Sequence, residues 1–271
     1  MAPVDVDAAV LRNTRLSADY NVLAFDAPAL AAAALPGQFV MIRTAAGTDP
    51  LLRRPFSVFE ILCDQAGRPS GITVLCKRIG PGTSRLYDAA AGDRLGVLGP
   101  LGRPFTIVAP PAEGWMVAGG VGLAPFAALA EALTAAGTPA RLFYGGRSAS
   151  DLFYVDWFER RSVRLDLTTE DGTRGVRGRV TAPLESALAS RPADQPVTLY
   201  ACGPEPMLKA VADLAARFGR PSQLSTERIM GCGLGGCYSC VVKVRDESGA
   251  VHFVRSCLNG PVFDGHALVW E

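Results

Sequence analysis

The chain has 271 residues, of which 49% are hydrophobic and 20% charged, and its formal net charge is +1. These values are typical of a globular protein with sizeable cores, and the length suits two domains with a smaller third one. Because no basic stripe accompanies the near-neutral charge, a nucleic-acid partner is not expected. No run approaches the ~20 apolar residues of a membrane span, and the N-terminus lacks the basic start of a signal peptide. We therefore expect a cytoplasmic protein without membrane association.

The first hundred residues consist of short apolar runs separated by turn sequences. We expect a short helix at residues 83–88 and strands over residues 37–43, 56–62, 71–80 and 94–98. Several short strands at this spacing predict a barrel or a sandwich. We assign residues 1–104 to this domain.

From about residue 105 onward, strand and helix patterns alternate. The expected strands are 115–118, 140–144, 163–168 and 197–201, and the expected helices end near residues 136, 160 and 218. This alternation predicts a parallel sheet with βαβ crossovers. We assign residues 105–226 to this second domain. A small third domain, 227–271, contains strands at 241–244 and 251–254.

Four cysteines of the third domain, Cys232, Cys237, Cys240 and Cys257, have the spacing C-x4-C-x2-C-x16-C. A reducing compartment disfavours disulfides, so clustered thiols indicate metal or redox chemistry. This spacing is that of plant-type 2Fe–2S proteins, whereas zinc sites more often pair two C-x2-C knuckles. Glycines at 231, 233, 235 and 236 permit the positive φ that wrapping a cluster needs. We expect a 2Fe–2S cluster, with zinc or unliganded thiols as the alternatives.

The other cysteines and the two histidines have more ordinary interpretations. Cys63 and Cys76 fall in or beside strands, where a cysteine packs as a small apolar residue. Cys202 ends a strand of the α/β half, where ligands of open parallel sheets bind, so it either faces a ligand or packs. His252 and His266 are expected to be surface or packing residues.

Two motifs in the first domain suit a flavin nucleotide. Arg54-Pro55-Phe56-Ser57 offers a guanidinium for phosphate, a ring for packing and a hydroxyl for hydrogen bonding. Gly82-Thr83 opens a helix whose free N–H groups can meet a pyrophosphate. An ordinary turn-to-strand junction and an ordinary capped helix are the alternative interpretations.

A glycine-rich turn, GGVGLAP at residues 119–125, lies between a strand and a helix, as dinucleotide-binding turns do. Gly120 and Gly122 allow the backbone to approach a phosphate closely; the alternative is a simple tight turn. The acidic residue that marks NAD about twenty positions later is absent, and Arg147 stands nearby.

Taken in order, RPFS, GTS, GPLG at residues 99–102, GGVGLAP and CGP at residues 202–204 resemble the motifs of the ferredoxin–NADP reductase superfamily. This resemblance covers roughly residues 5–225. With the cysteine-rich tail added, the whole chain is similar to the family of electron-transfer subunits of type 1B dihydroorotate dehydrogenases.

The resemblance implies an α+β multidomain fold with an antiparallel β-barrel FAD domain, an α/β parallel-sheet NAD domain and a small C-terminal 2Fe–2S domain. The four clustered cysteines would be the metal ligands, and Gly120 and Gly122 would lie near the phosphates of NAD. Cys202 would lie near the nicotinamide as the catalytic residue. The FAD would be bound by Arg54, Pro55, Phe56, Ser57, Leu75, Cys76, Lys77, Gly82 and Thr83.

The resemblance also implies a partner, an FMN-containing dihydroorotate dehydrogenase catalytic subunit, in a heterotetramer with two copies of each chain. Electrons would pass from FMN through the cluster and FAD to NAD in pyrimidine biosynthesis. One alternative is a related subunit of a sulfide dehydrogenase, transhydrogenase or hydrogenase complex. Others are a reductase that feeds an oxygenase, and a zinc-stabilised binding module without flavin.

Overall fold

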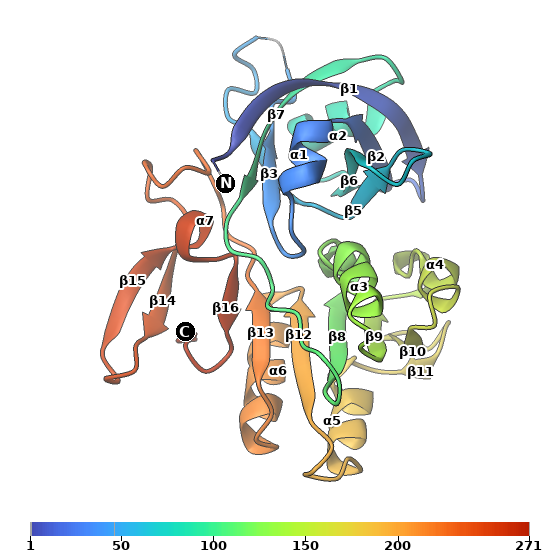
Figure 1. Ribbon diagram of the computed structural model, residues 1–271, viewed down its shortest axis with the longest axis vertical. Helices are drawn as coiled ribbons and strands as arrows, with labels where there is room; N and C mark the ends of the chain where they lie inside the picture. The colour runs from blue at the N-terminus through green and yellow to red at the C-terminus, as the bar shows by residue number, and fades with distance from the viewer. Residues whose placement is uncertain (1, 46, 271) are drawn as a thin grey trace.

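Two seven-stranded sheets, one antiparallel and one mainly parallel, and a two-stranded ribbon form the framework of the chain (Figure 1). The computed structural model describes residues 2–45 and 47–270. In Figure 1 the antiparallel sheet lies above the parallel one, and the ribbon lies to the left of the parallel sheet. Among the described residues, no helix is long and apolar enough to cross a membrane.

The antiparallel sheet has the order β4-β3-β7-β1-β2-β6-β5 and curls around its own apolar core, in which α1 covers one side (Figure 1). This curled sheet is the predicted barrel. Its elements are β1 Val4–Arg15, β2 Tyr20–Asp26, α1 Pro28–Ala33, β3 Phe39–Ile42, β4 Arg54–Ser57, β5 Glu60–Cys63, β6 Pro69–Lys77, α2 Pro81–Asp88 and β7 Arg94–Leu101.

The barrel differs from expectation in several places. The predicted strand 56–62 is two strands, β4 and β5, and the helix begins at Pro81 rather than at residue 83. Strands β1 and β2 and helix α1 were not predicted at all. Cys63 is exposed, so its expected core packing is wrong, because β5 is an edge strand and Cys63 is its last residue. Cys76 is buried as predicted.

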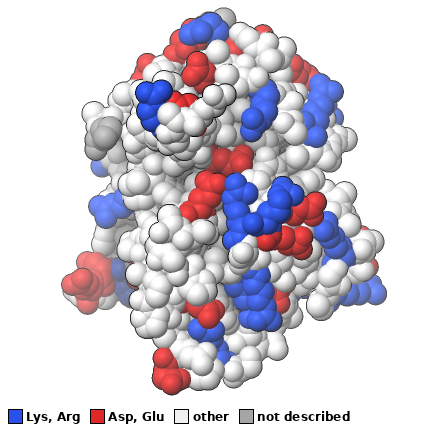
Figure 2. Space-filling view, turned by 45° about the vertical axis from the view of Figure 1, so that its right-hand side comes forward, with Lys and Arg blue, Asp and Glu red and all other residues white. Residues whose placement is uncertain are grey.

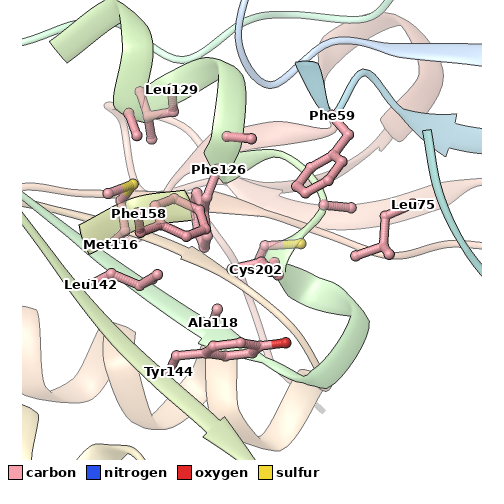
Figure 3. Close-up of a cluster of buried hydrophobic side chains, with 14 of the residues drawn as sticks. Phe59, Leu75, Met116, Ala118, Phe126, Leu129, Leu142, Tyr144, Phe158 and Cys202 are labelled. Atoms are coloured by element: carbon pink, nitrogen blue, oxygen red, sulfur yellow. The ribbon is translucent and has the colours of Figure 1, made fainter. Parts of the chain in front are cut away.

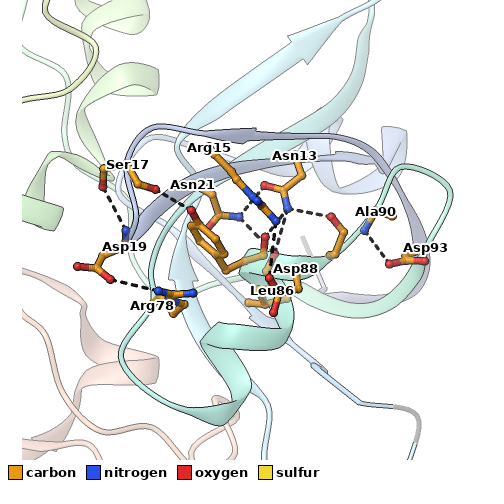
Figure 4. Close-up of polar contacts among 12 residues, drawn as sticks. Asn13, Arg15, Ser17, Asp19, Asn21, Arg78, Leu86, Asp88, Ala90 and Asp93 are labelled. Carbon is orange, nitrogen blue, oxygen red and sulfur yellow. Dashed lines mark hydrogen bonds and ion pairs between the residues drawn. The ribbon is translucent and has the colours of Figure 1, made fainter.

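Two asparagines attach helix α2 to the β1–β2 hairpin (Figure 4). The Nδ2 atom of Asn13 donates to the carbonyl oxygens of Tyr87 at 2.9 Å and Ala89 at 2.8 Å. The Nδ2 atom of Asn21 donates to the Leu86 carbonyl at 3.2 Å and to Asn13 Oδ1 at 2.8 Å. The last carbonyls of a helix have no intrahelical partner, so these bonds satisfy them and fix where the helix points.

The second sheet has the order β11-β10-β9-β8-β12-β13-β16 and is parallel except for the β13–β16 pair. It confirms the predicted βαβ arrangement. Helix α4 ends at Glu159, next to the predicted end near residue 160, and α5 was not predicted. The elements are β8 Glu113–Gly119, η1 Gly120–Leu123, α3 Phe126–Ala135, β9 Ala140–Gly146, η2 Ala149–Asp151, α4 Val155–Glu159, β10 Arg164–Thr169, β11 Val176–Arg177, α5 Thr181–Ala189, β12 Val197–Cys202, α6 Glu205–Arg217 and β13 Ser222–Ser225.

The C-terminal segment contains the ribbon of β14 (Val241–Arg245) and β15 (Val251–Arg255), then α7 (Ser256–Asn259) and β16 (Val262–Asp264). Strand β16 returns to the parallel sheet and pairs with β13. The expected three-part fold class is therefore confirmed, with the last strand of the chain completing the second sheet. His252 and His266 are both exposed, as predicted.

The two large sheets share one apolar core. Phe59 and Leu75 of the barrel lie in the same cluster of buried side chains as Phe126 and Cys202 of the α/β half (Figure 3). The backbone N–H of Ala128 donates to the Phe59 carbonyl at 2.8 Å, so a hydrogen bond also joins the two parts.

Replacing Asn21 tests the attachment of α2. Asn21→Ala removes the bonds that the buried Asn21 amide donates to the Leu86 carbonyl and to Asn13 Oδ1, so we expect the free energy of unfolding to fall by about 1–3 kcal/mol. Urea denaturation of the cofactor-loaded chain measures this. Asp88→Ala on the same helix is the control, because it removes only an exposed ion pair with Arg15 at 3.7 Å and should cost less than about 1 kcal/mol. Equal losses from both substitutions would contradict the assigned role of Asn21.

Candidate functional site

A cleft of about 450 Å³ lies between the barrel and the carboxyl ends of the parallel strands. This is the edge at which open α/β sheets bind ligands. We call it the nucleotide cleft. The barrel contributes Tyr20 and Lys77, and the other lining residues are Gly119, Gly120, Val121, Gly145, Gly146, Arg147, Asp151, Glu170, Gly178, Arg179, Val180, Thr181, Pro204, Pro206, Met207, Ala210 and Glu227.

The two glycines predicted to approach a phosphate lie in different surroundings. Gly120 lines the cleft and has φ +55°, a backbone conformation that favours glycine. Gly122 is buried, and a Cβ placed on it would lie 2.1 Å from the Cys202 carbonyl oxygen. The structure thus gives Gly122 a packing reason to be glycine: it lets the η1 turn approach the end of β12.

Cys202 is the last residue of β12 and is 3% exposed. Figure 3 shows it between Ala118 and Leu75, at the junction of the sheet and the barrel. Burial raises the pKa of the thiol, and the nearby Glu227 carboxylate raises it further. Cys202 is therefore held as a neutral thiol, suited to packing or hydrogen bonding and not to attack as a thiolate.

Several cleft residues were missed from the sequence. Glu227 follows β13, whose short polar sequence does not indicate a strand. Burial raises the pKa of the Glu227 carboxyl, and the nearby Lys77 ammonium partly lowers it again. Glu170 follows β10 and provides the cleft with an acidic side chain, further along the chain than the twenty positions after the glycine turn at which one was expected. Arg147, which the sequence had already singled out, lines the cleft as well, with its Nε 3.4 Å from the Asp151 carboxylate.

A second feature of the barrel fits a pyrophosphate. A Cβ placed on Gly82 would lie 3.3 Å from both Arg54 Nε and Thr44 Oγ1. Thr44 Oγ1 is buried and has no hydrogen-bond partner among the described residues. Gly82 and Thr83 lie in the first turn of α2, where backbone N–H groups have no intrahelical acceptor. An orphaned hydroxyl, a guanidinium and free N–H groups around a glycine suit a phosphate ligand, and Thr44 is a member that sequence reasoning missed.

The side chains of the other predicted flavin residues are largely engaged in packing or in hydrogen bonds within the protein. Leu75 and Cys76 lie in two different apolar cores on opposite faces of β6, so only their backbone is available to a cofactor. Burial raises the pKa of Cys76 to about 12. The hydroxyl of Thr83 accepts from the Ile79 and Gly80 N–H groups at 2.8 and 3.0 Å, which stabilises the turn before α2. Pro55, Phe56 and Ser57 are half-buried on the edge strand β4.

The four clustered cysteines are brought together in two pairs. Cys237 lies beside Cys232, and Cys257 lies beside Cys240; Cys232 is also near enough to Cys257 to raise the pKa of its thiol, so the two pairs adjoin each other. Backbone N–H groups of Leu234 and Cys257 donate to the sulfurs of Cys232 and Cys240 at 3.3 and 3.4 Å. No three His, Cys, Asp or Glu side chains within the described ranges converge as a single metal ion requires. Two thiol pairs therefore suit the two irons of a 2Fe–2S cluster better than one tetrahedral zinc.

The two pairs differ in environment. Hydrogen bonds from Ser239, and then from Cys232, lower the pKa of the exposed Cys237 to about 6. Burial, and then Cys240, raises the pKa of Cys257 to about 12. We call residues 231–240 the cysteine loop. Cys237 of the first pair is next to solvent, whereas Cys240 and Cys257 pack with Phe39, Met41, Leu101 and Met230.

Only part of the glycine prediction for this loop is right. Gly233 and Gly235 have φ of +72° and +83°. Gly231 and Gly236 do not have positive φ; a Cβ on Gly231 would lie 3.2 Å from Cys237 Sγ, so this glycine leaves room for the sulfur. A Cβ on Gly233 would lie 2.6 Å from Met41 Cγ, which shows how closely the loop approaches the barrel.

The cysteine loop and the candidate flavin strand are neighbours. Met41, which contacts Gly233, lies on β3 and is opposite Pro55 of β4 in the strand register. Adjacent strands are about 4.8 Å apart, so one strand separates the loop from the RPFS sequence.

Comparison with known proteins agrees with this arrangement. Residues 227–269 match the family model for the iron-sulfur cluster binding domain of dihydroorotate dehydrogenase B, and residues 116–213 match that for the oxidoreductase NAD-binding domain. The dihydroorotate dehydrogenase B (NAD(+)) electron transfer subunit of Desulforamulus reducens is 35% identical over 266 residues, 98% of each chain. The chain belongs to the family of dihydroorotate dehydrogenase B electron transfer subunits. The subunit of the same name from Geobacillus kaustophilus is 40% identical over 237 residues, 86% of each chain.

Solved structures show the same fold. The structure of an NADH-dependent reduced ferredoxin-NADP oxidoreductase, described for flavin-based electron bifurcation, is 30% identical with a TM-score of 0.83 over 98% of this chain and 90% of that one. The ferredoxin reductase of carbazole 1,9a-dioxygenase is 23% identical with a TM-score of 0.67 over 81% of this chain and 67% of that one, a likeness of fold. The matched models confirm the iron–sulfur and NAD assignments of this dihydroorotate dehydrogenase B family member, and the ferredoxin–NADP reductase-like fold supports FAD.

Substitution of Gly122 tests the close approach of η1 to β12. Gly122→Ala would place a methyl group 2.1 Å from the Cys202 carbonyl oxygen, so the turn must move. We expect a loss of stability of about 1–3 kcal/mol and a marked fall in NADH–dye reductase activity. Gly47→Ala is the matched control, since a Cβ there meets nothing within 4 Å. Unchanged stability in Gly122→Ala would refute the packing role.

Alkylation distinguishes the cysteines outside the cluster. We expect iodoacetamide to label Cys63 in the native, cofactor-loaded chain and to spare Cys76 and Cys202, because Cys63 is exposed while burial raises the pKa of the other two thiols. Peptide mass spectrometry reads out each site. Labelling of Cys202 at the rate of Cys63 would show that the junction of sheet and barrel is open to solvent.

Proposed function

We propose that this chain is the electron-transfer subunit of a dihydroorotate dehydrogenase complex, moving electrons from the FMN of a catalytic subunit through a 2Fe–2S cluster and FAD to NAD in pyrimidine biosynthesis. When bound, FAD exchanges a hydride with nicotinamide and the cluster carries single electrons. The observation that carries the proposal is spatial order. The cysteine loop packs on β3, the candidate flavin strand β4 is next to β3, and the nucleotide cleft lies between the barrel and the parallel sheet.

We assign residues to the groups on the same basis. Arg54, Gly82 and Thr83, joined by Thr44, are proposed to hold the pyrophosphate of FAD. The rest of the proposed flavin contact is made by Pro55, Phe56, Ser57, Leu75, Cys76 and Lys77. Gly120 is proposed to approach the phosphates of NAD, with Gly122 and Cys202 shaping the nicotinamide end. Cys232, Cys237, Cys240 and Cys257 are the proposed cluster ligands, and the division into domains 1–104, 105–226 and 227–271 follows these roles.

The surroundings of the cysteine loop support a partner there. Ile229, Leu234, Tyr238, Phe253 and Leu258 are large apolar residues that are exposed near the ribbon and the cysteine loop, and Ile229 is 86% exposed. A group of exposed apolar residues of this kind commonly marks a protein interface. We infer that the FMN-containing catalytic subunit docks beside the exposed Cys237, in a cytoplasmic heterotetramer with two copies of each chain.

A related electron-transfer subunit of a sulfide dehydrogenase, transhydrogenase or hydrogenase complex would share the fold. The curated relatives above, which bear the dihydroorotate dehydrogenase name over most of the chain, favour the first function.

Reconstitution tests the proposal. The chain is expressed together with an FMN-containing dihydroorotate dehydrogenase from the same genome and purified as a complex. We expect dihydroorotate-dependent reduction of NAD, followed at 340 nm, with equal amounts of orotate formed. If the complex reduces NAD with another electron donor but not with dihydroorotate, the proposal is wrong, and the chain serves one of the related complexes instead.

Cys237→Ser tests the place of the cluster in the sequence of carriers. Loss of one ligand should remove the visible absorbance and electron paramagnetic resonance signal of the cluster and lower dihydroorotate-dependent NAD reduction at least about 100-fold. FAD content and NADH–dye reductase activity should stay within about twofold, because the cradle at Gly82 and the nucleotide cleft contain no cluster residue.

Cys63→Ser is the matched control, since Cys63 is an exposed cysteine on the barrel. Cys63→Ser should change neither the visible absorbance nor the electron paramagnetic resonance signal of the cluster. Loss of FAD from Cys237→Ser would instead place the cysteine loop inside the flavin site.

A further inference from the structure

A second hollow, of about 590 Å³, opens between the barrel and the α/β half. It shares no lining residue with the nucleotide cleft. Figure 2 shows the face that carries α4, with basic and acidic side chains gathered across the middle, between the upper and lower parts of the molecule. We call it the arginine hollow, and its lining residues are Arg12, Glu60, Leu152, Tyr154, Val155, Asp156, Trp157, Arg160 and Arg174.

Three guanidinium groups reach this hollow from distant parts of the chain. Arg12 comes from β1, Arg160 follows α4, and Arg174 lies between β10 and β11. Within the described residues, none of the three side chains has an ion pair or a hydrogen bond. Nearby arginines are engaged: Arg141 binds Asp166 at 2.6 Å and Arg161 binds Glu131 at 3.1 Å. Other arginines, such as Arg164 and Arg177, also lack a side-chain partner within the described residues, but Arg12, Arg160 and Arg174 line one and the same hollow.

The carboxylates of the hollow do not neutralise these charges. Glu60 accepts a hydrogen bond from the Thr73 hydroxyl at 3.0 Å and faces Tyr154, and burial raises the pKa of its carboxyl. Arg12 is near enough to oppose that rise but does not reach ion-pair distance. With Asp156 as the other acid, three positive groups face at most two negative ones.

Tyr154, which forms one wall of the arginine hollow, is held in place by its packing against the barrel. Tyr154 has φ +60°, a left-handed conformation that is strained for a bulky residue, and it caps α4. Its ring packs edge-on against Phe59 of the barrel at 4.7 Å between centroids. The strain is sustained by a contact between the two halves of the molecule at the base of the hollow.

We propose that the arginine hollow binds a small anion that carries a phosphate or carboxylate group, held by Arg12, Arg160 and Arg174 and separate from the NAD site. Guanidinium groups bind such anions through pairs of charge-assisted hydrogen bonds. The ligand would join β1 of the barrel to the segments after α4 and β10. Arg174 lies between Glu170 and Gly178, which line the nucleotide cleft. An anion bound to Arg174 would therefore contact the same loop that forms part of the NAD site.

Calorimetric titration of the FAD- and cluster-loaded chain tests this binding. Inorganic phosphate and citrate are titrated separately, at constant ionic strength and with saturating NAD, which fills the nucleotide cleft. We expect one site per chain for at least one of the two anions. Arg160→Gln and Arg174→Gln should each weaken that site about tenfold or more. Both side chains are exposed, so the variants should fold, which flavin absorbance and the thermal midpoint verify.

Arg164→Gln is the matched control, an exposed arginine of the same sheet that lies outside the hollow. It should change the dissociation constant by less than about twofold. The proposal is overturned if neither anion binds to the NAD-saturated chain, or if the bound anion is insensitive to Arg160→Gln and Arg174→Gln. Equal weakening by Arg164→Gln would also overturn it, because it would reduce the effect to overall surface charge. Phosphate binding without citrate binding, or the reverse, identifies the class of ligand.

Discussion

The apolar contact between the barrel and the parallel sheet is the constraint on which the other arrangements depend. Phe59 is wholly buried at this contact, where it belongs to the same core as Phe126 and Cys202. Interfaces between domains of one chain are usually more polar and permit relative motion. Here the two halves share one continuous core, so the walls of the nucleotide cleft are joined through packed side chains.

Hydrogen bonds extend this constraint to the proposed pyrophosphate site formed by Thr44, Arg54, Gly82 and Thr83. Asn13 and Asn21 hold the end of α2, and the beginning of the same helix brings Gly82 beside Arg54 and Thr44. Anions at a helix start are stabilised only where the N–H groups face them, so the direction of this short helix matters as much as its composition. The cysteine loop is oriented similarly, by burial of Cys240 and Cys257 against the barrel while Cys237 faces solvent.

Chemistry was easier to predict from this sequence than architecture. The cysteine spacing indicates the cluster because metal coordination imposes local spacing, and the glycine turn at 119–122 is local as well. The proposed flavin cradle is not local: Thr44, Arg54 and Gly82 come from three segments that only the fold brings together, and Thr44 follows a strand with no motif. Strand β1 was missed although Val4, Val6 and Ala8 alternate with Asp5 and Asp7 at its start. Glu227 was missed because the four residues of β13 are too short and polar to be recognised as a strand.

The pairing of β16 with β13 means that the cysteine-rich segment cannot be treated as a detachable ferredoxin. The segment leaves the parallel sheet after β13 and returns to it, and the Thr226 N–H donates to the Pro261 carbonyl at 2.9 Å where the outgoing and returning chains meet. Cutting the chain before residue 227 would leave β13 as an open edge strand, the kind of surface at which sheets of different molecules join and aggregate. The cysteine-rich segment thus also supplies β16, the edge strand that completes the parallel sheet. Exchange of this segment between reductases would therefore have to include the sheet edge as well as the cysteines.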